Sequence, residues 1–130
     1  MSSQYAFFAG ILRFVAKKTA TDDADIQVMM GHLAGIADAV EKTGQFMILR
    51  ENCESAARGF AGVAKFLQER ILPEALADGN KGAVEQLKWA IETSLALAAE
   101  LVKRITVADY EGQASFTFDL PQPPGAPKPH

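Results

Sequence analysis

The sequence predicts an all-α protein, a four-helix up-down bundle that ends in an extended strap and a disordered proline-rich tail. Apolar residues recur at alternating spacings of three and four along three long segments, and this pattern places them on one face of a helix. Turn-forming residues separate the segments, so neighbouring helices are expected to run antiparallel. Five of the six prolines lie within residues 121–130, where neither a helix nor a strand ladder can continue.

The composition is that of one soluble globular domain. The chain has 130 residues, of which 48% are hydrophobic and 22% charged, and this length supports a core without disulfides or metal. The formal net charge is -3, and basic and acidic residues are interspersed. No electrostatic field therefore favours nucleic acid or an anionic membrane as a partner. Cys53 is the single cysteine, which excludes an internal disulfide and predicts a reducing, cytoplasmic location.

The first helix is predicted over residues 3–19, where Ser2 and Ser3 offer capping side chains. Its apolar run AFFAGIL precedes the nearby positive charges, which is the reverse of a signal peptide, and is too short to span a membrane. The apolar residues of this helix fall on two stripes, so one packing surface does not cover them all. Phe7 and Phe14 lie on the second stripe and are therefore candidate contact residues.

The other three helices are predicted over residues 22–43, 46–72 and 81–108. Acidic and capping residues at 21–25 begin the second helix, and Gly44 ends it. Pro73 ends the third helix or begins a short extra turn, and Asn80 caps the fourth. Short connections between these segments favour an up-down-up-down arrangement.

The fourth helix carries apolar residues away from its main seam. That seam runs through Leu87 and Ile91, which leaves Trp89 and Leu97 pointing elsewhere. Tryptophan is enriched at the centres of protein interfaces, so these two residues predict a second buried surface. Either a partner covers Trp89, or the first helix or the strap does.

Residues 113–120 are predicted to form the extended strap. Phe116, Phe118 and Leu120 alternate with polar residues, which places them on one face of an extended chain. Three arrangements remain open, because the strap can lie on its own bundle, pair with its copy in a homodimer, or join another protein by strand addition. The helical bundle accordingly spans residues 1–112, and residues 121–130 form the disordered tail.

No sequence motif for a metal centre is present. A di-iron bundle needs two Glu-x-x-His pairs, whereas His32 and His130 are the only histidines and Met29 stands three residues before His32. His32 is interpreted as a boundary histidine. Haem held by His32 and a methionine such as Met29, Met30 or Met47 remains an open alternative.

Catalytic chemistry is not indicated either. Cys53 lies on an apolar seam and is interpreted as inert packing. Glu51 and Glu54, which have arginines nearby, are interpreted as a solvated ion-pair face rather than an acid–base pair. Gly59 and Gly62 lie inside a predicted helix, where they favour the close approach of another helix rather than phosphate binding.

We therefore expect a non-enzymatic protein without a cofactor that acts through protein–protein contacts, as an adaptor, a chaperone-like partner or an assembly subunit. A homodimer is the expected form. The expected contact residues are Phe7, Phe14, Trp89, Leu97, Phe116, Phe118 and Leu120. The alternative function is binding of a small apolar ligand or haem between the helices, where small residues near Phe60 and Phe66 would leave room for it.

Overall fold

The structure is a computed structural model that describes residues 4–19 and 21–125. It is mostly helical and contains one small two-stranded sheet. The helices are α1 (Ala6–Lys18), α2 (Ala24–Thr43), α3 (Cys53–Phe66), α4 (Leu72–Ala77) and α5 (Lys81–Thr106). The strands are β1 (Gln45–Leu49) and β2 (Ser115–Asp119). Two short 3-10 turns, Arg50–Asn52 and Ala108–Tyr110, and a π-helical turn, Leu67–Ile71, complete the elements.

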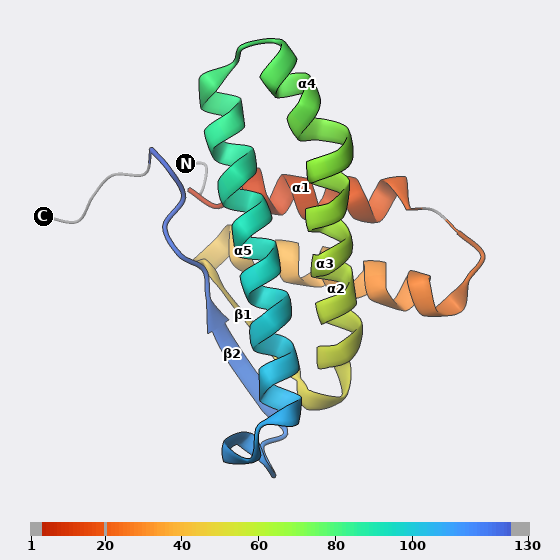
Figure 1. The fold of residues 1–130 in the computed structure, drawn as a ribbon. Helices are drawn as coiled ribbons and strands as arrows, with labels where there is room; N and C mark the ends of the chain where they lie inside the picture. The colour runs from red at the N-terminus through yellow and green to blue at the C-terminus, as the bar shows by residue number, and fades with distance from the viewer. Residues whose placement is uncertain (1–3, 20, 126–130) are drawn as a thin grey trace, which may run out of the picture.

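The helices form two antiparallel pairs that cross each other. Figure 1 shows α1 and α2 running across the pair formed by α3 and α5, rather than alongside it. Within each pair the helices are in contact, and α3 also contacts α1 and α2. The mostly helical prediction is therefore confirmed, whereas the structure does not confirm four aligned helices in an up-down bundle.

Local signals at helix ends behave as the sequence indicates. The Asp23 side chain caps α2 by accepting from the backbone N–H groups of Asp25 and Ile26, and Asn80 caps α5 in the same way. Gly44 ends α2 in the left-handed conformation, with φ of 74°. The predicted caps Ser2 and Ser3 lie outside the described residues.

The predicted third helix is wrong at its beginning. Residues 45–49 form strand β1 instead, and the helix starts at Cys53. Phe46 and Ile48 of this strand are buried, while the residues between them are exposed. This alternation is the period of a strand with one buried face. The backbone N–H and C=O groups that face the neighbouring strand form ladder hydrogen bonds in place of the hydrogen bonds of a helix.

Beyond Phe66 the third helix continues through the π-helical turn into α4. The Leu72 N–H donates to the Leu67 carbonyl, five residues back. Pro73 has no N–H to continue the ordinary pattern, and its ring would clash with the carbonyl four residues earlier. A local widening of the helix relieves that clash. Pro73 lies in the first turn of the short helix α4, so the predicted short extra turn is confirmed.

The predicted strap is strand β2, and it lies on its own chain. It pairs antiparallel with β1, with Phe118 opposite Phe46 and Phe116 opposite Ile48. The chain after β2 is ordered further than the predicted tail allows, because Pro123 is buried and Gln86 donates a hydrogen bond to the Pro124 carbonyl at 2.9 Å. Residues 126–130 of the predicted tail lie outside the described residues.

The core joins both helix pairs to the sheet through aromatic contacts. Phe60 stacks with Phe8 at 6.5 Å between ring centroids and lies 6.1 Å from the Phe46 ring. Gly59 lets α2 approach closely, since a Cβ there would lie 3.1 Å from the Leu33 side chain. The predicted close helix approach is confirmed at Gly59 and wrong at Gly62, which is exposed and where an added Cβ would meet nothing within 4 Å. Burial of these apolar surfaces is the main force that holds the crossed pairs together.

Candidate functional site

Two large aromatic side chains are exposed along α1. Phe7 and Phe14 are each 45% exposed, and two helical turns separate them. Between them lies Gly10, where an added Cβ would meet nothing within 4 Å. The two rings and the open glycine therefore form a ridge, a gap and a second ridge along one helix face.

A groove of about 350 Å³ runs beside this face. Its walls come from α1, the π-helical turn and α5. The lining residues are Ala6, Phe7, Gly10, Ile11, Phe14, Leu67, Ile71 and Leu87. All of these residues are apolar, so the groove offers dispersion and burial but no polar group for chemistry. We call the groove together with its two phenylalanines the α1 face.

Two neighbours fix the Phe14 side chain. Its ring lies 5.9 Å from the Phe66 ring, and the Lys18 ammonium lies 5.6 Å from its centroid. The helix itself is tied to α2, since Arg13 donates to Asp38 at 2.7 Å and also to Glu41. The α1 face is therefore held in place by the fold.

Trp89 and Leu97, predicted as partner contacts, pack inside this chain. Trp89 is half-buried, and its indole meets the Phe8 ring edge-on at 5.5 Å. Leu97 is only 6% exposed. The second buried surface inferred for α5 exists, but α1 and the core of the same chain cover it. The indole N–H of Trp89 is buried without a hydrogen-bond partner among the described residues.

The three strap residues predicted as contacts are also buried. Phe116, Phe118 and Leu120 are 5 to 6% exposed, and their side chains face the core of their own chain. Phe116 and Leu120 can be reached only by removing β2 from β1, whereas Phe118 also lines a groove between β2 and α5. Of the predicted contact residues, only Phe7 and Phe14 present a substantial surface.

Arg50 and Arg104 contact the loop that precedes β2. Arg50 donates to the Gln113 carbonyl at 2.7 Å and to the Tyr110 carbonyl, and its guanidinium lies 5.2 Å from the Phe116 ring. Arg104 lies 4.3 Å from the Tyr110 ring and pairs with Glu100 at 2.9 Å. Such stacked guanidinium groups hold the loop before β2 in place.

A second groove, also about 350 Å³ in volume, separates α5 from β2. Its lining is more polar than that of the α1 face. It consists of Thr93, Ala96, Leu97, Glu100, Arg104, Thr117, Phe118, Asp119 and Pro121. We call this cavity the edge groove. The sequence did not predict the edge groove, because no residue pattern indicates that a gap separates α5 from β2.

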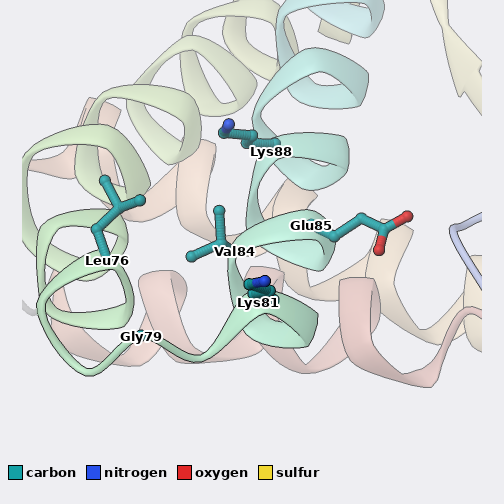
Figure 2. A pocket seen from close by; sticks show the side chains of 6 residues that line it. All are labelled: Leu76, Gly79, Lys81, Val84, Glu85 and Lys88. Carbon is teal, nitrogen blue, oxygen red and sulfur yellow. The ribbon is translucent and has the colours of Figure 1, made fainter.

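A third pocket, of about 340 Å³, lies at the tip of the α4–α5 hairpin. Figure 2 shows Val84 between the two helices on the side of Leu76, whereas Glu85 points away. Lys81 and Lys88 stand at its rim and are exposed. Exposed lysines around an open apolar patch provide no fixed polar geometry, so we assign no chemistry to this pocket.

Cys53 is fully buried, and its thiol donates to the Leu49 carbonyl at 3.5 Å. Burial raises the pKa of the thiol, although Arg50 and Arg104 act in the opposite direction. The thiol is therefore protonated at neutral pH and closed to solvent, as the sequence interpretation expects of a packing cysteine.

His32 and Met47, one of the methionines considered as a second haem ligand, line the same small cavity of about 220 Å³. Met47 is 64% exposed on the outer face of β1, and His32 Nε2 is buried without a partner in the described part of the chain. Ala56 and Phe60, near which the alternative function would place a ligand, are fully buried in the packed core. Among residues 4–19 and 21–125, no cluster of three or more His, Cys, Asp or Glu side chains is placed to hold a metal.

Glu51 and Glu54 line an open polar pocket together with Arg58. Arg58 lies 3.5 Å from Glu54, and both side chains are about 70% exposed. This geometry is a solvated ion pair on a helix surface, as the sequence indicates.

Comparisons with protein-family models, curated proteins and solved structures give no match. No helix within the described ranges combines the length and apolarity needed to cross a membrane.

Proposed function

We propose that this protein is a non-enzymatic helical protein that acts through protein contacts, and that it forms a homodimer through the α1 face. The observation that carries the proposal is the exposed pair Phe7 and Phe14, with the open position at Gly10 between them. Fully burying a phenylalanine contributes about 1.5–3 kcal/mol relative to leaving it in water. Two such rings beside an apolar groove favour a partner that covers them.

The α1 face is complementary to itself, which favours a second copy as the occupant. A two-fold axis across α1 near Gly10 and Ile11 would place Phe7 of one copy opposite Phe14 of the other. Gly10 of each copy would then give room for close approach of the helices. A closed two-fold interface of this kind is the commonest form of protein assembly.

We infer that the dimer works in the cytoplasm as an adaptor, a chaperone-like partner or an assembly subunit. The support for a reducing compartment is the single cysteine, which is buried and free. The net charge of -3 supports a protein rather than a nucleic acid or an anionic membrane as the partner.

Gly10→Glu tests the dimer, and Gly35→Glu is the matched control. Both glycines are exposed within helices, with nothing within 4 Å of an added Cβ, so each substitution also improves helix propensity. Gly35 lines the small cavity next to β1 and not the α1 face. Gly10→Glu would place two carboxylates opposite each other at the proposed axis.

Light scattering behind size exclusion, at several protein concentrations, gives the readout. We expect a dimer for the unchanged chain and for Gly35→Glu, and a monomer for Gly10→Glu. A monomer for the unchanged chain at all concentrations rules out the homodimer. A dimer that survives Gly10→Glu places the interface elsewhere and overturns the assignment to the α1 face.

A further inference from the structure

The outer edge of β2 carries backbone groups that the sheet does not use. The Leu120 N–H donates to the Gly44 carbonyl at 2.9 Å, and the Arg50 N–H donates to the Ala114 carbonyl at 2.8 Å. With the antiparallel register, these bonds direct the even-numbered residues of β2 toward β1. The backbone N–H and C=O groups of Ser115, Thr117 and Asp119 therefore point away from β1.

No further strand covers that edge in the part of the chain that the structure describes. The edge groove runs beside it instead. Three consecutive β2 residues, Thr117, Phe118 and Asp119, line the groove. Side chains of successive strand residues point to opposite faces, so a cavity that touches all three runs along the strand edge and not over one face. Figure 1 shows β2 alongside the C-terminal half of α5.

The opposite wall of the edge groove is one face of α5. Thr93, Leu97, Glu100 and Arg104 recur at helical spacing along that wall. Its volume of about 350 Å³ is at the lower end of the range for small-molecule pockets, roughly 300–1,000 Å³, so it holds part of a peptide and leaves the rest in solvent. The groove thus combines an unpaired ladder edge with side chains that can contact whatever occupies it.

We propose that the edge groove binds a short extended peptide segment of another protein, which adds to β2 as a third strand. Main-chain hydrogen bonds to Ser115, Thr117 and Asp119 supply the affinity, and the α5 wall selects the side chains. β2 has five residues, so a paired peptide of about five residues, roughly 17 Å long, matches it. This inference is independent of the proposed dimer, which uses the α1 face.

The shape of the groove favours a single peptide over a second copy of this sheet. A second copy would bring its own β1 and α5 to this groove, whose opposite wall is already α5 of this chain, whereas a single peptide brings neither. The chain after β2 is no better candidate, because Gln86 holds Pro124 beside the N-terminal half of α5. The prolines at 121, 123 and 124 also lack the N–H groups that a ladder needs.

Charge and size define the peptide class. Asp119 is exposed and accepts a hydrogen bond from the neutral Gln45 side chain, which leaves its charge without a cationic partner there. Arg104 is already engaged by Glu100. A peptide with one basic residue, and with small or β-branched residues toward Ala96 and Leu97, therefore fits the groove best.

The probe is the peptide acetyl-Lys-Val-Thr-Val-Thr-amide, titrated into the full chain and followed by calorimetry and amide NMR. Two N-methylated forms of the probe serve as a matched pair, one methylated at both valines and the other at both threonines. Alternate amides of an added strand face β2. One methylated form must therefore lose binding at least tenfold while the other retains it, and the amide signals of Ser115, Thr117 and Asp119 must shift.

Thr117→Pro removes the central outward N–H while leaving the ladder to β1 complete. Its control is Met47→Pro, which removes the equivalent N–H from the outer edge of β1, because Met47 and Thr117 are opposite each other. We expect Thr117→Pro to weaken peptide binding about tenfold and Met47→Pro to leave it unchanged. Ala96→Arg fills the exposed wall of the edge groove without touching the sheet, and must also abolish binding.

Each other result overturns the proposal. Absence of binding to the unmethylated probe, or equal loss with both methylated forms, rules out strand addition at this edge. If Ala96→Arg binds the probe normally, the peptide lies outside the edge groove. If Thr117→Pro converts a dimer of the full chain into a monomer, a second copy occupies the edge, and the peptide is the wrong occupant.

Discussion

Phe46 and Phe118 lie directly opposite each other in the two-stranded sheet, with ring centroids 5.3 Å apart and an interplanar angle of 24°. The pair joins the segment after α2 to the segment after α5. Phe46 in turn packs near Phe60 of α3. This contact fixes the C-terminal strand on the helices and thereby sets the position of the edge groove.

Phe118→Ala should lower the free energy of unfolding by about 3 kcal/mol, because it leaves a cavity where a 6% exposed ring lies between the sheet and the helices. Thr117→Ala, one residue earlier on the exposed face, should change it by less than about 0.5 kcal/mol. Urea unfolding followed by circular dichroism measures both. Similar losses for the two variants would contradict the burial of the Phe118 face.

A comparison of Gly44→Ala with Gly79→Ala distinguishes the cost of backbone strain, which both variants have, from the cost of steric overlap, which only Gly44→Ala has. Both glycines have positive φ, 74° and 69° respectively, which costs another residue about 1–2 kcal/mol. An added Cβ at Gly79 meets nothing within 4 Å, whereas at Gly44 it would overlap the Tyr5 ring. We expect Gly44→Ala to destabilise the protein by at least 1 kcal/mol more than Gly79→Ala, owing to overpacking. Equal thermal unfolding midpoints for the two variants would refute the Tyr5 contact.

Arg50→Ala should loosen the loop before β2 and cost about 1–2 kcal/mol of stability, because its guanidinium donates to the carbonyls of Tyr110 and Gln113. Arg50→Lys should lose similar stability, since an ammonium group lacks the planar arrangement of N–H donors that the guanidinium offers to two carbonyls. Arg58→Ala is the control, because its exposed pair with Glu54 contributes less than about 0.5 kcal/mol. Hydrogen exchange of the residue 110–114 amides should accelerate in the Arg50 variants alone.

Ser94→Ala should stabilise the protein by about 1 kcal/mol. The Ser94 hydroxyl is fully buried and has no hydrogen-bond partner among the described residues, so the folded state carries its desolvation cost. Alanine removes that hydroxyl and also favours the helix. A lower urea midpoint for Ser94→Ala would mean that the hydroxyl has a partner, such as a bound water.

Stability should fall at alkaline pH in part because of Cys53. Burial raises the pKa of its thiol in the folded state above the unfolded value, which is about 8.5. The unfolded chain therefore loses this proton first as pH rises, and the stability contribution, complete below the unfolded pKa, is lost as pH rises through the folded pKa. Cys53→Ala should show a smaller decline in unfolding free energy between about pH 7.5 and about pH 10. An equal decline would contradict the raised pKa.

The helix ends are where sequence reasoning performs best, because their signals are local. Asp23 and Asn80 cap helices through their own side chains, and Gly44 ends α2 by adopting a positive φ. Each of these depends on a few neighbouring residues. Sequence reasoning fails at residues 45–49. The sequence QFMIL is compatible with a strand as well as with a helical seam, and the alternation of Phe46 and Ile48 is the only signal for the strand.

The predicted contact residues also differ in whether a local signal or the tertiary structure determines their exposure. The exposure of Phe7 and Phe14 could be predicted from α1 alone, because apolar residues on two sides of a helix exceed what one packing surface covers. Leu97 and the strap phenylalanines were equally apolar, but whether such residues face a partner or their own core depends on which elements surround them.

The sequence alone determines that this chain is mostly helical, where most of its helices end, and which residues are apolar enough to need burial. The tertiary structure alone decides that the helices cross in pairs, that residues 45–49 become a strand, and that β2 has one paired and one open edge. The physical reason is the range of the interactions involved. Capping and helix periodicity act over a few residues, whereas the pairing of Phe46 with Phe118 brings together segments from opposite halves of the chain.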